Sequence, residues 1–398
     1  MRRATFSTLL TAGALLAAGS ATAGGWYQEP SVRLRTGFDD NIRLRSSDPQ
    51  EDFVTTLQGD GLFGYRTETE SAALKLKAEA NQYQQQDGLN NENLFADLNL
   101  DHKGERNSFG LLTSLHRDTT LQSELETTGR VDDNLRVTRQ LLQPSFEHSF
   151  AERWVGSVGA SYSEVEYEDR VGSSLTDYRY VTAQTALQYR VSEDRSFTGT
   201  LFATRYTPTD FDFISRGQGV SLGWQERFSP SLTGSLSVGA RKDKSERTLF
   251  GIQTEDDSFG AQFDAALEKS WQRWRLNLNL GRSTDPSGDG SLIQRDRLGG
   301  TASYDWNERV RLIFNANYLD IQQTNDLVSL SSNDRRYLTF APGIEWRVER
   351  NWTARFDYRY RQNRFLDQGD EAEGNALFVS ISYLWPSPLG SSGQGKPL

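Results

Sequence analysis

The chain beyond residue 30 repeats one pattern: two strand-like runs joined by a short polar turn and followed by a longer polar segment. Within the runs, apolar and polar residues alternate, which places the two kinds on opposite faces of a β-sheet. The clearest run is 352–360, where Trp, Ala, Phe, Tyr and Tyr alternate with Thr, Arg, Asp and Arg. We count about 18 runs of about 10–14 residues, an even number as in bacterial membrane barrels. The pattern predicts an all-β protein, a single antiparallel transmembrane β-barrel.

The connections between the runs fall into two length classes. The short ones lie at 67–70, 104–106, 151–153, 192–194, 229–231, 272–273, 307–309 and 349–351. The longer ones lie at 46–52, 84–92, 119–134, 168–176, 207–215, 243–257, 284–295, 321–335 and 363–374. In outer-membrane barrels short turns face the periplasm and long loops face the outside. Tryptophans cluster at the short turns, which predicts an interfacial belt there; they are Trp154, Trp271, Trp274, Trp306, Trp346, Trp352 and Trp385.

The N-terminal segment 1–23 has the features of a secretory signal: Arg2 and Arg3, an apolar stretch over 6–18, and Ala-Thr-Ala at 21–23. We therefore expect a signal peptide at 1–23, the barrel at 24–385 and a polar tail at 386–398. Only 36% of the 398 residues are hydrophobic, which is low for a soluble core but suits a barrel with a polar lumen. The absence of Cys excludes disulfides and thiolate metal sites, and a net charge of −10 argues against a general nucleic-acid binder.

The last run, 377–385, alternates Leu, Val, Ile, Tyr and Trp with other residues. It resembles the C-terminal strand signature by which outer-membrane barrels are recognised for assembly, although here the polar tail follows it. The expected partners are therefore the lipid bilayer of a Gram-negative outer membrane and the barrel assembly machinery.

The first run, 30–42, contains Gly-Phe-Asp-Asp-Asn at 37–41. It resembles the first strand of a β-barrel porin family of Gram-negative bacteria, in which a G-[YF]-D-D-N element precedes the first loop. Some members of that family accompany exopolysaccharide or capsule gene clusters. The resemblance implies export of a polysaccharide, with the polymer and periplasmic export components as partners. From the residues alone, Asp39, Asp40 and Asn41 also fit a strand end that enters a turn.

Charged residues in the runs must face the lumen, because a charge facing hydrocarbon costs about 2–4 kcal/mol at the midplane. When the barrel closes, the last two runs and the first become neighbours, and Ser380 and Ser382 lie between two arginine-bearing strands. Guanidinium groups bind carboxylate and phosphate, so this basic trough would suit an anion; its residues are Arg33, Arg35, Arg355, Arg359 and Arg361. In the alternative interpretation the charges pair across strands, Arg359 with Asp357 or another nearby acid, and only keep the lumen hydrated.

The third long loop, 119–134, is acidic and resembles the loop that narrows the pore of general porins. If it folds inward, it would face the basic wall and form a constriction; its acidic residues are Glu124, Glu126, Asp132 and Asp133. A solvated surface loop is the other interpretation, and the sequence leaves both open.

The residues give no support for an enzyme. The histidines, His102, His116 and His148, fall at separate places on the predicted strands and suggest neither a metal site nor a triad. We expect no cofactor and no metal. The predicted function is a channel, with polysaccharide export as the preferred interpretation. A general or anion-preferring diffusion porin, and a structural or adhesive barrel that binds a partner through its outer loops, are the alternatives.

Overall fold

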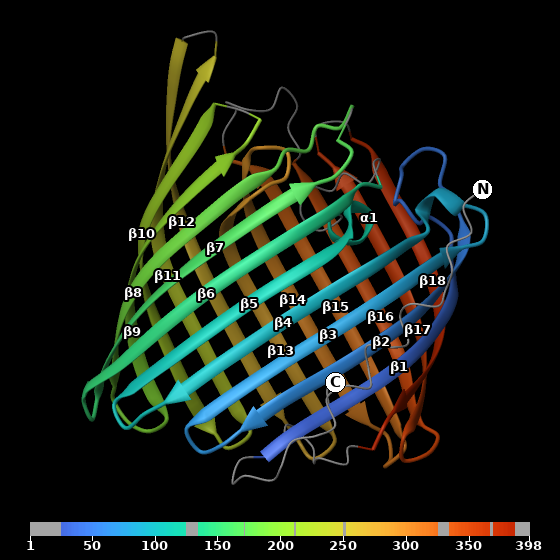
Figure 1. Ribbon diagram of the computed structural model, residues 1–398, viewed down its shortest axis with the longest axis horizontal. Helices are drawn as coiled ribbons and strands as arrows, with labels where there is room; N and C mark the ends of the chain where they lie inside the picture. The colour runs from blue at the N-terminus through green and yellow to red at the C-terminus, as the bar shows by residue number, and fades with distance from the viewer. Residues whose placement is uncertain are drawn as a thin grey trace.

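The computed structural model describes residues 25–124, 134–170, 172–210, 212–249, 252–324, 334–366 and 369–386. They form one 18-stranded antiparallel sheet that closes on itself, because β1 pairs with both β2 and β18 (Figure 1). The predicted barrel and its strand number are therefore confirmed.

The strands follow one another around the barrel in chain order. The first nine are β1 (Gly25–Asp39), β2 (Asp52–Arg66), β3 (Glu70–Tyr83), β4 (Asn91–Lys103), β5 (Asn107–Thr119), β6 (Arg136–Ala151), β7 (Trp154–Tyr167), β8 (Tyr178–Arg190) and β9 (Arg195–Pro208). The others are β10 (Phe213–Ser229), β11 (Leu232–Leu249), β12 (Ile252–Ser270), β13 (Trp274–Pro286), β14 (Leu292–Asp305), β15 (Val310–Gln323), β16 (Arg335–Arg347), β17 (Trp352–Phe365) and β18 (Glu371–Leu384). In the described parts of the long connections lie two short helices, η1 (Asp87–Leu89) and α1 (Thr120–Ser123).

The alternation in the strands separates a lipid face from a lumen face. Leu34, Phe356 and Val379 expose about half of their surface on the outside, as a band facing hydrocarbon requires. Aromatic pairs at the short-turn ends have ring centroids 4.7–5.0 Å apart and form the predicted belt; they are Trp26–Tyr65, Trp154–Tyr189, Trp274–Tyr304 and Trp352–Tyr383. The molecule is thus a barrel of the Gram-negative outer membrane. No helix in the described part of the chain is both long and apolar enough to cross a membrane.

The short connections contain two to four residues, close to the predicted turns. The prediction of a long loop over 243–257 is wrong, because β11 and β12 remain paired to Leu249 and Ile252 and project beyond the rim (Figure 1). Charge-rich sequence usually indicates a loop, but here opposite charges meet across the hairpin. Lys242 lies 2.7 Å from Asp257 and Lys244 lies 3.0 Å from Glu255.

Described parts of three long connections reach into the outer end of the barrel. Leu44, from the β1–β2 loop, is buried in an apolar cluster with lumen-facing residues of β14–β16 and β18, and Leu121 of α1 packs against it. The β13–β14 loop reaches the wall at β9, where the Tyr206 hydroxyl donates a hydrogen bond of 2.8 Å to the Ser287 carbonyl. These loops narrow the outer end of the lumen.

Candidate functional site: an arginine-lined cavity in the lumen

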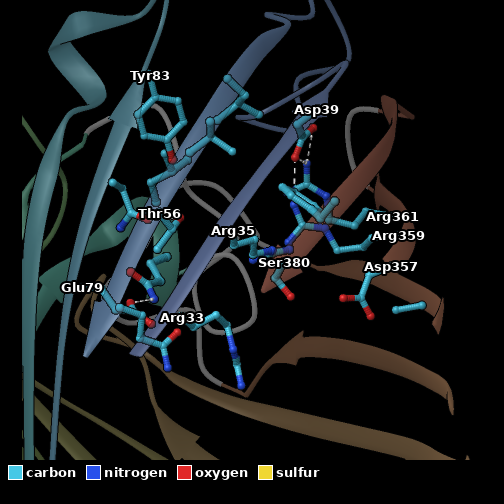
Figure 2. Close-up of a pocket in the computed structure, with 18 of the residues that line it drawn as sticks. Arg33, Arg35, Asp39, Thr56, Glu79, Tyr83, Asp357, Arg359, Arg361 and Ser380 are labelled. Atoms are coloured by element: carbon cyan, nitrogen blue, oxygen red, sulfur yellow. Dashed lines mark hydrogen bonds and ion pairs between the residues drawn. The ribbon is translucent and has the colours of Figure 1, made fainter. Parts of the chain in front are cut away.

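A cavity of about 510 Å³ lies in the lumen beneath the β1–β2 loop and α1. Its walls come from β1–β4 and β16–β18, the strands that meet where the barrel closes (Figure 2). The five arginines predicted to form a trough all line it. Their role in binding anions stays a prediction.

Strand register explains how the arginines meet. Arg33 and Arg35 of β1 lie opposite Ser382 and Ser380 of β18. On the other edge of β18, Arg355 of β17 also lies opposite Ser380. Arg359 and Arg361 follow on the same face of β17, towards the outer end, opposite the small residues at positions 376 and 374.

One residue of the site is absent from the sequence-based prediction. Phe378 projects into the cavity between the two arginine-bearing strands. The Arg35 guanidinium carbon lies 3.6 Å from the centroid of its ring, and that of Arg359 lies 5.2 Å away. Strict alternation through Ser380 and Ser382 would have placed Phe378 on this face, so the signal was present.

Acidic partners neutralise part of the trough. The buried carboxylate of Asp39 accepts hydrogen bonds of 2.8 Å from both Arg359 and Arg361. Arg355 forms an ion pair with Asp357, in which Nη2 and Oδ1 are 2.6 Å apart. Arg359 therefore does pair with a nearby acid, but this acid is Asp39. Asp357 pairs with Arg355, on the same strand, instead.

Two arginines have no acidic partner within the described residues. The Arg33 Nε donates to the Ser382 hydroxyl at 3.1 Å. Arg35 contacts the Phe378 ring, and its buried Nε has no hydrogen-bond partner. Figure 2 shows Arg35 ending close to Arg359, so two cationic groups share one side of the cavity.

The Asp39-Asp40-Asn41 sequence shapes the strand end above the cavity. Asp39 holds the two arginines, and Asp40 accepts hydrogen bonds from the backbone and side-chain nitrogens of Asn375 on β18. Asn41 donates to the carbonyls of Arg45 and Glu373, at 2.8 Å each, which turns the first loop inward. The structural interpretation of this motif accounts for these contacts.

The wall opposite the arginines is uncharged over much of its height. β1 and β10 are diametrically placed in the ring of strands, and the lumen-facing positions of β8–β10 alternate with exposed apolar residues such as Leu201 and Val220. Most of these positions carry small or amide side chains, among them Thr182, Gln184, Thr198, Thr200, Gly219, Ser221 and Gly223, while Tyr180 and Phe202 are aromatic. The arginines that line the cavity therefore lie across the lumen from a stretch of wall with little charge.

The described part of the third long loop folds inward. Leu121 and Gln122 line the cavity, and Glu124 is 2% exposed. Glu124 does not face the basic trough, since it accepts hydrogen bonds from Arg139 at 2.8 Å and from the Tyr167 hydroxyl at 2.9 Å. That this loop constricts the pore stays a prediction; Glu126, Asp132 and Asp133 lie outside the described residues.

The histidines are separate. His102 contacts Glu70, His116 contacts Asp97 at 2.8 Å, and His148 contacts Asn107 at 2.7 Å. Throughout the residues with described positions, no three His, Asp or Glu side chains form a group that could hold a metal ion.

No family model and no curated protein matches the chain. Among solved structures, the chain is similar to the copper transporter OprC, with 9% identity, a TM-score of 0.47, and coverage of 92% of this chain and 82% of that one. It is also similar to OccAB3 of Acinetobacter baumannii, with 13% identity, a TM-score of 0.43, and coverage of 90% and 99%. A third similar structure is the outer membrane protein opdK of Pseudomonas aeruginosa, with 11% identity, a TM-score of 0.45, and coverage of 91% of this chain and 98% of that one. The likeness concerns the barrel fold alone.

Proposed function

We propose that the protein is an outer-membrane channel for small solutes that prefers anions. The observation that carries this proposal is the pair of arginines, Arg33 and Arg35, that line the lumen with no acidic partner in the described structure. Positive charge on one wall of a narrow aqueous path attracts anions and repels cations. The hydroxyl and amide groups of the β8–β10 wall, together with ion pairs elsewhere in the lumen such as Arg275–Asp305, keep the path polar for a hydrated solute.

Polysaccharide export, implied by the family resemblance, has less support from this geometry. A polymer needs a continuous passage, whereas the β1–β2 loop and α1 occupy the outer mouth through the apolar cluster around Leu44 and Leu121. The narrowing suits small solutes. A gene deletion that lowers surface polysaccharide would restore the export interpretation.

Liposome swelling tests the proposal. Liposomes that contain the purified barrel should swell in an isosmotic solution of a small organic anion, and faster than in a neutral solute of the same size. If the liposomes swell in none of the small solutes, that result would contradict a diffusion channel. Faster entry of a small organic cation than of the anion would contradict the charge preference.

A further inference from the structure

The cationic groups of the cavity converge on one aromatic ring. Arg35, from β1, and Arg359, from β17, both place their guanidinium groups within 5.2 Å of the Phe378 ring centroid. Two like charges in such proximity repel, and the cost falls when an anion lies between them. Arg359 and Arg361 both form ion pairs with Asp39, whereas Arg35 forms an ion pair with none of the described acidic residues.

The charges that line the cavity do not balance. Its lining holds five arginines and three acids, Asp39, Glu79 and Asp357, which leaves an excess of two positive charges. Asp39 and Asp357 pair with lining arginines, whereas Glu79 pairs at 2.9 Å with Lys77, which is outside this lining. With Glu79 paired to Lys77, the five arginines keep three positive charges in excess of Asp39 and Asp357, and a ligand with two negative charges compensates more of this excess than a monovalent anion does.

Several side chains of the cavity wall contain polar atoms without a hydrogen-bond partner. The Nε atoms of Arg35 and Arg359 are buried without a hydrogen-bond partner, and so is the Thr339 hydroxyl. All three residues line the cavity. A buried donor without a partner is costly; the parts of Arg35 and Arg359 that a ligand can reach are the remaining, part-exposed portions of these side chains.

We infer that this cavity binds a divalent oxyanion, either a dicarboxylate or a phosphate, between Arg35 and Arg359. This inference rests on the proposed channel function and specifies the class of solute that the lumen selects. Guanidinium groups bind both carboxylate and phosphate through paired N–H donors. The Phe378 ring itself is not open to an aromatic ligand, because it is 3% exposed and Arg35 lies 3.6 Å from its centroid.

Calorimetric titration of the purified full-length barrel in detergent tests the inference without requiring conductance. The probes are succinate and inorganic phosphate as divalent anions and acetate as the monovalent one, at equal ionic strength and about pH 8, where phosphate is mostly divalent. Succinate, phosphate or both should bind about tenfold or more tightly than acetate, because each added charge gains attraction to the arginines. Preference for succinate would identify a dicarboxylate site, and preference for phosphate a phosphate site.

Variants localise the binding. Arg35→Ser should weaken divalent binding about tenfold, and Arg35→Lys should weaken it less because the charge remains. Arg33→Ser, at a solvent-exposed lumen position, gives a second test if Arg35→Ser does not fold. The matched control is Arg275→Ser on β13, which removes one lumen arginine but leaves its partner Asp305 paired with Arg311 at 2.7 Å.

Equal affinity for acetate and both divalent anions would overturn the inference, as would equal losses in Arg35→Ser and Arg275→Ser. If the channel is anion-selective but shows either result, only this inference fails. If divalent binding depends on Arg35 but the channel is not anion-selective, the cavity is a binding site and the proposed transport function fails.

Discussion

Gly37 of β1 lies directly opposite Phe378 of β18, and its missing side chain makes room for the Phe378 ring. A Cβ at position 37 would lie 2.4 Å from the Phe378 Cδ1 atom and 2.1 Å from the Leu377 carbonyl oxygen. The glycine of the Gly-Phe-Asp-Asp-Asn sequence therefore permits the ring on which Arg35 rests.

Gly37→Ala should destabilise the barrel by about 1–3 kcal/mol, because the added methyl group meets backbone as well as the Phe378 ring. The free energy of unfolding in urea, measured in detergent or lipid, checks this expectation. Gly59→Ala on β2 is the matched control, since a Cβ there would meet no atom within 4 Å. Equal effects of the two substitutions would contradict the close packing of Gly37 against Phe378.

Asp39→Asn should cost on the order of 3 kcal/mol of stability, because it leaves the buried Arg361 and its neighbour Arg359 without their shared carboxylate. The same substitution adds positive charge to the lumen and should increase the preference for anions. Urea unfolding and ion selectivity are the two measurements. Asp194→Asn, which disturbs an exposed pair with Arg227, should change stability by less than about 1 kcal/mol. A neutral effect of Asp39→Asn on both measurements would refute the role assigned to Asp39.

Tyr167→Phe should weaken the attachment of the third loop by about 1 kcal/mol, since the hydroxyl that donates to Glu124 is lost. Glu124→Gln removes the charge that holds Arg139 and should loosen the segment further. Both variants should raise single-channel conductance, because α1 narrows the lumen only while it is held inward. Glu168→Gln, at an exposed pair with Arg117, serves as the control. Unchanged conductance in Glu124→Gln would show that this segment does not limit flow.

The sequence was sufficient for the fold and for the direction of most lumen side chains. Period-two alternation places Arg33 and Arg35 on the same face without knowledge of the structure, because a strand has only two faces. The pairing of Asp39 with Arg359 was not predictable in this way. It depends on the register of β1 and β17 against β18 across the closure of the barrel, and no turn connects β1 to β18 to set it.

The sequence also did not predict how the long loops fold. The inward fold of the β1–β2 loop depends on Leu44 finding an apolar cluster built from strands far away in the chain. The extension of β11 and β12 depends on cross-strand ion pairs such as Lys242–Asp257, whose residues separately favour loops. In both cases tertiary contacts outweigh local composition.

The zero-current potential of the reconstituted barrel across a KCl gradient tests the central claim most directly. The wild-type channel should prefer chloride, and the Arg33→Ser, Arg35→Ser double variant should lose most of that preference. Arg117→Ser at the outward-facing rim of β5 removes a charge outside the lumen and should leave the potential unchanged. A wild-type channel that prefers potassium, or a double variant with the wild-type potential, would contradict the account.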